Sequence, residues 1–191
     1  MYIKKIIPVS NTKKKIVTQE GISFCLYNKE VAGFELEEDE YFEDVYEKIF
    51  PILKERIYKR MLYLLSAREY SSYSLRAKLS DSYPEDLVEE AVAFAVSRHY
   101  VDDMDYIERY INAHKDKKSK LYLKSKLIEK GFDKKIIDAK LEELHLNEYD
   151  NIEALLNKKG YYDTDDRDEK RKMINYLLRQ GYRYSDIREF I

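Results

Sequence analysis

Three short stretches of this chain repeat one helical pattern at nearly constant spacing. Residues 75–79, 123–127 and 173–177 each open a helical run, and the last leucines of these stretches stand 48 and 50 residues apart. A turn and a second aliphatic segment follow each run. A period near 50 residues with about three helices per unit is typical of helical repeat arrays, in which each unit packs on its neighbours. Such arrays usually present binding surfaces, so the repeat favours binding over catalysis.

The composition supports a folded, mainly helical protein. Of the 191 residues 44% are hydrophobic, and only five are glycine and three proline, whereas turn-rich β folds need many of both. The single cysteine, Cys25, excludes a disulfide framework and fits a reducing compartment. Because the chain has no signal-peptide pattern and no apolar stretch of about 18 residues, we expect a soluble, cytoplasmic protein.

The beginning of the chain differs from the rest. Residues 15–19 and 22–27 flank Glu20-Gly21, which predicts a hairpin, and residues 3–9 form another extended segment. From about residue 39 the hydrophobic period becomes helical. The predicted fold is mainly α: tandem three-helix repeats that form an elongated, curved array, with a small N-terminal antiparallel β element. The expected parts are the β element at 1–38, a linker helix and first repeat at 39–101, a second repeat at 102–147 and a third at 148–191.

Two apolar stripes of helical period stand on either side of a proline. Tyr41, Val45 and Ile49 form the first stripe, before Pro51. The second begins at Ile57 and continues at spacings of four, seven and eight residues. We therefore expect helical structure both before and after the proline.

Local signals also mark where the repeated helices begin and end. Ser71 stands where the N-cap of the first repeated helix belongs, because its hydroxyl can accept a hydrogen bond from an unpaired amide. Gly131 and Gly181 occupy matching helix ends, where glycine best tolerates the left-handed conformation. The first unit has Tyr83-Pro84 in this place, so its turn must be built differently.

The net charge is only −2, but the sign of the charge alternates along the chain. Residues 56–80, 109–135 and 170–191 carry six, ten and six Lys or Arg against one, three and two acidic residues. The intervals 81–108 and 136–169 carry nine and eleven acidic residues against one and four basic ones. The sign changes in step with the repeat, so the basic blocks could line up on one side of the array. The alternative is that neighbouring helices pair these charges as solvated salt bridges.

The three basic blocks supply the candidate partner- or DNA-binding residues. A single lysine is usually only solvent-exposed, whereas a set in register with the repeat favours binding. Lys120 and Lys124 share a helix face, as do Lys117 and Lys120 if the helix begins early. The candidates are Arg68, Arg76 and Lys78 in the first block; Arg109, Lys117, Lys118, Lys120, Lys124 and Lys126 in the second; and Lys170, Arg171, Lys172 and Arg179 in the third.

No catalytic motif is present. The chain lacks a phosphate-binding loop, a dinucleotide fingerprint and a nucleophile elbow. His99, His114 and His145 each fall near a predicted helix C-terminus, where a partly charged imidazole suits the helix dipole. The acidic clusters at 37–40 and 163–168 lack the pattern of a calcium loop, so we expect solvated loops there. These observations predict a non-enzymatic protein with no metal and no cofactor.

The chain has nineteen tyrosines and no tryptophan, which is an unusual aromatic composition. Tyrosines interleaved with Lys and Arg can stack on bases, as in proteins that bind single strands. However, most of these tyrosines, such as Tyr63, Tyr106, Tyr110 and Tyr176, fall at helical core spacing. Packing is therefore the favoured role for any one of them.

Residues 64–79 resemble the helix–turn–helix signature of the RecX family, regulators of the RecA recombinase. This stretch has a leucine-rich helix end, then Arg68, then the Ser71 cap and a Leu-x-x-x-Leu segment that contains a lysine. Residues 100–110 and 123–132 resemble the elements that follow in the family. The N-terminal extended segment is similar to the strand pair ahead of the repeats, so the resemblance covers nearly the whole chain.

The chain departs from the family pattern in three places. Ser74 replaces the glutamate that usually follows the serine cap by three residues, so we expect the reciprocal half of a capping box to be missing. Residues 115–120 keep the positive charge of the second unit but lose the glycine. Many relatives are strongly basic, whereas this chain is not.

The resemblance implies a cytoplasmic regulator in DNA repair, the SOS response and homologous recombination. It would bind the RecA–single-stranded DNA filament and inhibit its ATPase, strand-exchange and coprotease activities. Three units of roughly 20–25 Å give an array of about 70 Å, long enough to bridge neighbouring protomers in the filament groove. Because Tyr176 replaces the lysine of the third copy, we expect the first two units to bind most strongly. The alternatives are a general helical-repeat interaction scaffold and a direct DNA-binding protein; we expect a monomer in each case.

Overall fold

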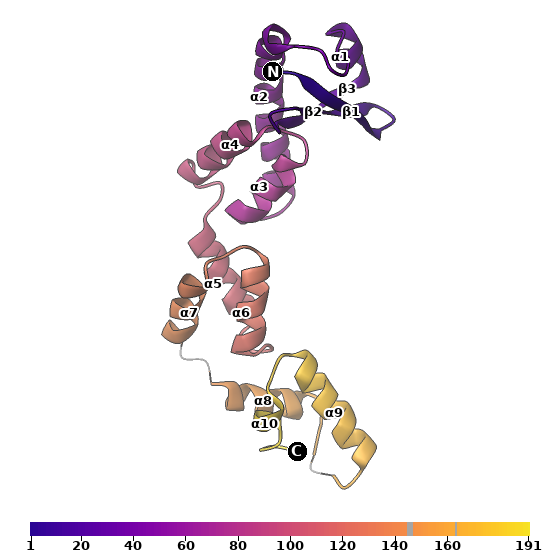
Figure 1. Ribbon diagram of the computed structural model, residues 1–191. Coiled ribbons are helices and arrows are strands. Elements are labelled where there is room, and N and C mark those ends of the chain that lie inside the picture. Colours follow the sequence, from indigo (N-terminus) through magenta and orange to yellow (C-terminus); the bar gives the residue numbers. More distant parts are fainter. Residues whose placement is uncertain (145–146, 163) are drawn as a thin grey trace. The chain divides into compact units, whose positions relative to one another are not determined.

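The structure is a computed structural model that describes residues 1–144, 147–162 and 164–191 (Figure 1). These residues are mainly helical and include one small N-terminal antiparallel sheet, which confirms the predicted fold class. Contacts within the chain define two compact units, Met1–Asp102 and Asp103–Ile191. The first unit has one hydrophobic core, whereas the second has two, one for each group of three helices.

The sheet consists of strands β1 (Ile3–Ser10), β2 (Lys13–Thr18) and β3 (Ser23–Tyr27), in the order β1-β2-β3. Both neighbouring pairs are antiparallel, as the hairpin signals predict. Gly21 has a φ of +88° in the turn before β3, which a side chain would strain. Ile3, Ile16, Phe24 and Leu26 of the strands belong to the hydrophobic core that the sheet shares with the helices of the first unit. A sheet of this size is marginal without such support.

The acidic residues at 37–40 form an exposed loop, as expected, and this loop also covers the outer edge of β1. The backbone N–H of Ile6 donates to Glu38 Oε1 at 2.8 Å. The N–H of Ile3 donates to the carbonyl of Glu40 at 3.0 Å. The N–H of Ile6 points away from β2. Because this direction alternates from one residue to the next along a strand, the backbone nitrogen of Pro8 also faces away from β2, and proline has no N–H there. The edge of β1 is therefore largely closed to strand addition.

Helix α1 (Asn28–Gly33) follows β3 directly and was not predicted. Glu30 in its first turn accepts a hydrogen bond of 2.8 Å from the backbone N–H of Tyr27. The same carboxylate forms an ion pair with Arg56, a residue of the next helix. Six residues are too few to show a helical period, so only these contacts reveal the helix.

Helix α2 (Glu43–Ala67) joins the two predicted apolar stripes into one helix of 25 residues that contains Pro51. Its buried residues recur every three or four positions, from Ile49 to Leu64. Tyr41 lies before the helix and is exposed, so it does not belong to the stripe as expected. Neither α2 nor any other helix in the described ranges is long and apolar enough to cross a membrane.

The remaining helices follow the repeat. In the first unit, α3 and α4 complete the group begun by α2, and two further groups of three make up the second unit (Figure 1). Their bounds are α3 (Ser72–Ser80), α4 (Glu85–Ser97), α5 (Asp103–His114), α6 (Lys120–Glu129), α7 (Lys134–Glu143), α8 (Glu148–Lys158), α9 (Arg167–Arg179) and α10 (Tyr184–Ile187).

A repeated leucine stands near the end of the middle helix in each of the three groups. Leu79, Leu127 and Leu177 are each fully buried. Their carbonyls accept hydrogen bonds of 3.2, 3.2 and 3.3 Å from the backbone N–H groups of Tyr83, Phe132 and Tyr182. These three aromatic residues are themselves buried, so each middle helix ends in a turn that carries one ring into the core of its group.

The capping of these middle helices is also repeated. The Ser71 hydroxyl accepts from the Ser74 N–H at 3.1 Å, which confirms the predicted cap of α3. The Ser74 hydroxyl accepts in turn from the Ser71 N–H at 3.0 Å. The expectation that half of the capping box is missing was therefore wrong, because a serine hydroxyl can replace the glutamate carboxylate as the acceptor. The side chains of Ser119 and Asp166 also accept hydrogen bonds from backbone N–H groups in the first turns of α6 and α9, without the reciprocal bond.

The predicted glycine turns are confirmed. Gly131 and Gly181 have φ values of +85° and +91°, so both adopt the left-handed conformation after α6 and α9. In the first group Asp81 follows the last residue of α3 with a φ of −59°, and no residue of that turn is left-handed. Proline at position 84 then serves as the N-cap residue of α4.

Candidate partner-binding surfaces

The first basic block does not form a single cluster. The guanidinium of Arg68 lies 4.5 Å from the ring centroid of Tyr70. Arg76 and Lys78 are two residues apart on α3, so they project from different sides of the helix. Lys78 is exposed, whereas Arg76 is half-buried.

Arg76 lies in an acidic cleft. Its Nε donates to Glu89 Oε1 at 2.5 Å and its terminal nitrogen to the other carboxylate oxygen at 3.0 Å. This bidentate pair lowers the pKa of Glu89. Glu20, Glu85 and Asp86 line the same cleft of about 780 Å³. The positive charge of Arg76 is therefore offset by its surroundings.

The second block divides between two faces of α6. Lys120 and Lys124 share one face, as predicted from their spacing, and line one cleft. Lys126 lies on the other side of the helix with Tyr122. Lys117 and Lys120 do not share a helix face, because α6 begins at Lys120 with Ser119 as its cap and Lys117 lies in the preceding turn.

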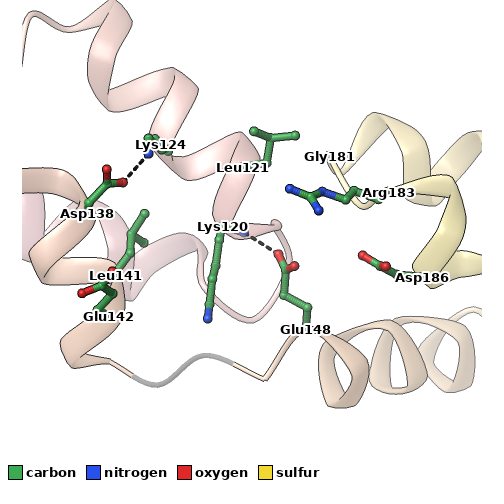
Figure 2. Close-up of a pocket in the computed structure, with 10 residues that line it drawn as sticks. All are labelled: Lys120, Leu121, Lys124, Asp138, Leu141, Glu142, Glu148, Gly181, Arg183 and Asp186. Atoms are coloured by element: carbon green, nitrogen blue, oxygen red, sulfur yellow. Dashed lines mark hydrogen bonds and ion pairs between the residues drawn. The ribbon is translucent and has the colours of Figure 1, made fainter. Parts of the chain in front are cut away.

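The cleft beside Lys120 and Lys124 has mixed charge (Figure 2). Lys124 forms an ion pair with Asp138 of α7. The backbone N–H of Lys120 donates to Glu148 Oε1 at 2.7 Å, so a carboxylate of α8 lies at the N-terminus of α6. The cleft, of about 450 Å³, is lined by Lys120, Leu121, Lys124, Asp138, Leu141, Glu142, Glu148, Gly181, Arg183 and Asp186. Four carboxylates beside three cations do not favour a polyanion here.

Ser119 ties the second group of helices to the third at this cleft. Its hydroxyl accepts from the N–H of Tyr122 at 3.1 Å and donates to the carbonyl of Gly181 at 2.6 Å. Its own N–H donates to the carbonyl of Gln180 at 3.1 Å. The side chain of Asn151 adds a bond of 2.7 Å to the carbonyl of Lys115. The leucine spacing in the sequence gives no sign of these long-range bonds.

The opposite side of α6 carries rings and lysines. Lys118 Nζ lies 4.2 Å and Lys126 Nζ 6.0 Å from the ring centroid of Tyr122. Lys126 also forms an ion pair of 2.6 Å with Glu129, whose hydrogen bond is the main cause of the raised pKa of this lysine. Burial, above all, raises the pKa of Tyr110 on α5, and the charges of Tyr122 and Lys126 act on it as well.

The remaining candidates lie apart. Arg109 is exposed on α5 and pairs with Asp105 one turn earlier at 2.7 Å. Lys170, Arg171 and Lys172 lie near the start of α9, and Arg179 ends it. Lys172 and Arg179 are seven residues apart and so share a face of that helix. Asp168 and Glu169 stand in the first turn of α9, so acidic charge accompanies the third block too.

The tyrosines are divided between packing and exposure. Tyr106, Tyr110 and Tyr176 pack against the cores of their groups, which confirms their predicted role. Tyr63 is 65% exposed beside Arg60, so its expected place in a core was wrong. Spacing alone cannot tell which side of a long helix faces the core.

The histidines that the structure describes lie at helix ends, as expected. The ring Nδ1 of His114, the last residue of α5, lies 2.8 Å from the carbonyl of Tyr110, and the two rings stack at 4.5 Å. His99 follows α4 with a φ of +55°. His145 lies outside the described residues. Within the described ranges, no group of three or more His, Cys, Asp and Glu side chains could hold a metal ion.

The sequence of this chain is similar to those of known regulatory proteins. Residues 147–191 match the family model described as RecX, third three-helix domain. The chain is 34% identical over 125 residues to the regulatory protein RecX of Clostridium acetobutylicum, and the alignment covers 61% of this chain and 58% of that protein. It is 31% identical over 138 residues to the regulatory protein RecX of Chlorobium limicola, which covers 68% of this chain and 84% of the relative.

The fold is also found among solved structures. A crystal structure of a regulatory protein RecX superposes with a TM-score of 0.59. The match covers 100% of this chain and 98% of that one, at 20% sequence identity. At this identity the likeness concerns the fold.

Proposed function

Since this chain belongs to the RecX family of regulatory proteins, we propose that it binds the RecA–single-stranded DNA filament and inhibits its ATPase, strand-exchange and coprotease activities. The relatives that it matches are named regulatory proteins, which supports a regulatory rather than an enzymatic role. The proposal places the protein in the cytoplasm, in homologous recombination, DNA repair and the SOS response.

The observation that carries the proposal is the repeated end of the middle helices. Three groups present a buried leucine, a turn and a buried ring in the same order, and in each the leucine carbonyl accepts a hydrogen bond from the backbone N–H of the aromatic residue. A protein built from repeated binding units suits a partner that is itself periodic, such as a filament of identical protomers. Contacts with successive protomers would resist the changes that accompany ATP turnover, because each protomer would be held to its neighbour.

The surface of this protein and the surface of the filament would be complementary in charge. The exposed side chains of the three basic blocks, Lys78, Lys117, Arg171, Lys172 and Arg179 among them, are the groups most open to acidic sites on the filament. Paired residues such as Arg76 and Lys124 contribute less, because their charge is already offset within the protein.

The test is the DNA-dependent ATPase of the cognate RecA, measured with increasing amounts of the full chain. We expect inhibition at well below one molecule per RecA protomer. The double variant Lys117→Glu/Lys120→Glu should weaken the inhibition at least several-fold, since it reverses charge in the second block. The matched control Lys134→Glu/Lys135→Glu reverses two exposed lysines outside the candidate set and should leave inhibition unchanged.

Two results would contradict the proposal. Absence of inhibition at equimolar protein would leave the two alternatives, a general interaction scaffold with the same fold and a direct DNA-binding protein. Equal inhibition by both double variants would remove the second basic block from the binding surface. Sedimentation of the protein with the assembled filament provides an independent measure of binding.

A further inference from the structure

The face of the sheet that is turned away from the core carries lysines beside aliphatic side chains. Ile16 of β2 belongs to the core, so its neighbours Lys15 and Val17 lie on the other face of the sheet. There they stand opposite Ile7 and Lys5 of β1. Each of the two pairs thus sets a lysine beside an aliphatic side chain. We call Lys5, Ile7, Lys15 and Val17 the hairpin face.

The hairpin face is positively charged. The first 19 residues of the chain include five lysines and no acidic residue. Among the described residues, no carboxylate lies within ion-pair distance of Lys5 or Lys15. The acidic loop 37–40 runs along the edge of β1 and not over this face, because Glu38 accepts from a backbone N–H, which lies in the plane of the sheet. The charges of Lys5 and Lys15 are therefore open to a partner.

The acidic cleft around Arg76 adjoins the hairpin face. Ser23 of β3 stands opposite Val17 and lines this cleft. A row of neighbouring residues thus runs across the sheet from Lys5 through Val17 to the cleft. Strands lie about 4.8 Å apart, so the row spans roughly 10 Å. A basic and an acidic region therefore lie side by side on one surface of the first unit.

The cleft offers apolar groups as well as carboxylates. Its apolar lining comes from Ile22, Tyr83 and Pro84. Arg76 pairs with Glu89, and Glu20 lies 3.8 Å from the N-terminal ammonium. Glu85 and Asp86 keep their charges, since no cation forms an ion pair with either among the described residues. The cleft thus complements the hairpin face, with two open carboxylates against two open lysines.

We propose that two copies of this chain associate through this surface about a two-fold axis, with the hairpin face of each copy against the acidic cleft of the other. Rotation by half a turn exchanges two neighbouring regions, so a surface that is basic on one side and acidic on the other complements itself. Lys5 and Lys15 of each copy would meet Glu85 and Asp86 of the other. The exposed side chain of Ile7 would reach the apolar lining of the cleft.

Other partners would fit only half of this surface. A polyanion or an acidic peptide would be attracted by the hairpin face and repelled by the adjoining cleft. A basic peptide would meet the reverse arrangement. The inference replaces the monomer that we expected from the sequence, and it concerns the protein in the absence of RecA. It can therefore fail or succeed separately from the proposed function.

The test is sedimentation equilibrium of the full chain over a wide range of concentrations. We expect a monomer–dimer equilibrium that shifts toward the monomer in about 1 M salt, where the Debye length is only roughly 3 Å. Lys5→Glu/Lys15→Glu and Glu85→Lys/Asp86→Lys should each weaken dimerisation by about tenfold or more. Each of these variants places like charges against one another at both contacts of the dimer.

The decisive measurement mixes these two charge-reversed variants. In the mixed dimer a reversed hairpin face meets a reversed cleft, and a native hairpin face meets a native cleft. We expect the mixture to dimerise with an affinity within about threefold of the parent protein, because opposite charges again face each other at both contacts. Such recovery also shows that both variants are folded.

Matched controls reverse exposed charges elsewhere in the chain. Lys48→Glu/Lys134→Glu and Glu47→Lys/Glu153→Lys should dimerise like the parent protein. Glu85→Gln/Asp86→Asn removes the charges of the cleft while keeping the shapes of the side chains, and it should also weaken dimerisation several-fold. This variant tests the cleft even if the lysine substitutions disturb the start of α4. Circular dichroism of each variant checks its fold.

Three results overturn the inference. They are a parent protein that stays monomeric at every concentration, a folded hairpin or cleft variant that dimerises like the parent, and a mixture of two folded variants that does not recover. Growth beyond the dimer would overturn the two-fold arrangement, because a head-to-tail contact continues from copy to copy and does not close.

Discussion

The hydroxyl of Ser119 donates a hydrogen bond of 2.6 Å to the backbone carbonyl of Gly181, 62 residues later in the chain. The same hydroxyl caps α6, so one side chain both starts a helix of the second group and holds the glycine turn of the third. This turn lies so close that a Cβ on Gly181 would stand 2.6 Å from Tyr122 Cβ and 2.7 Å from Ser119 Oγ. The serine and the glycine therefore depend on each other.

Replacement of Gly181 by alanine should destabilise the protein by about 2–4 kcal/mol. Its φ of +91° strains any side chain, and the new methyl group would also clash with Tyr122 and Ser119. Gly160→Ala is the control, because Gly160 has a φ of +64° but no atom within 4 Å of the added Cβ. It should lose only about 1–2 kcal/mol. Urea denaturation followed by circular dichroism measures both, and equal losses would contradict the close contact.

Ser119→Ala should cost about 1–3 kcal/mol of stability. The substitution removes the cap of α6 and leaves the Gly181 carbonyl without its donor. Ser125→Ala provides the comparison, since Ser125 is an exposed residue in the middle of the same helix and alanine is the better helix former. That variant should be neutral or slightly more stable in the same denaturation assay. A neutral Ser119→Ala would show that water replaces both bonds.

The ion pair of Glu30 and Arg56 should make stability depend on pH. Burial acts to raise the pKa of Glu30, but its hydrogen bonds with Arg56 and with the Tyr27 N–H and the nearby positive charges outweigh burial, so the pKa lies below its ordinary 4.5. A lowered pKa stabilises the fold above the ordinary value, and this contribution is lost as pH falls through the folded pKa.

Glu30→Gln should therefore reduce stability by about 1–2 kcal/mol at neutral pH, because a charged acceptor is replaced by a neutral one. The difference from the parent protein should shrink in acid, below the ordinary pKa of 4.5. Denaturation at several pH values measures this. Glu55→Gln, which affects a largely exposed pair with Lys59, should change stability little at any pH. A gap between Glu30→Gln and the parent that persists in acid would exclude the charge as its cause.

Opening the edge of β1 should promote self-association. In the double variant Pro8→Thr/Glu38→Ala, the strand gains an outward N–H at position 8 and the N–H of Ile6 loses its acceptor. We expect dimers or larger species that increase with concentration in analytical ultracentrifugation. Glu37→Ala, a neighbouring exposed acidic residue, should leave the distribution unchanged. An unchanged distribution for the double variant would show that another feature protects the edge.

The prediction from sequence succeeded where the signal is local. The buried leucines 79, 127 and 177, the Ser71 cap and the left-handed Gly131 each follow from residues within a few positions of one another. The prediction failed where the local pattern was too short to read or was compatible with two different structures. Helix α1 is too short to show a period, and Tyr63 points away from the core despite its spacing.

The candidate binding residues show the same difference between what local spacing predicts and what helix packing determines. Spacing correctly grouped Lys120 with Lys124, because residues four apart on a helix share a face. It could not show that Asp138 neutralises Lys124, or that Lys118 and Lys126 lie with Tyr122 on another face. Those facts depend on which helices pack together.

The sequence by itself determined the repeat, the helix ends and the mainly helical class, because hydrophobic period and turn chemistry act over short stretches of chain. Only the tertiary structure decided which basic residues remain available to a partner. Burial and pairing depend on side chains far apart in the sequence, such as Arg76 with Glu89 and Lys120 with Glu148. The bond from Ser119 to Gly181 belongs to that second kind, since no local pattern connects two residues 62 positions apart.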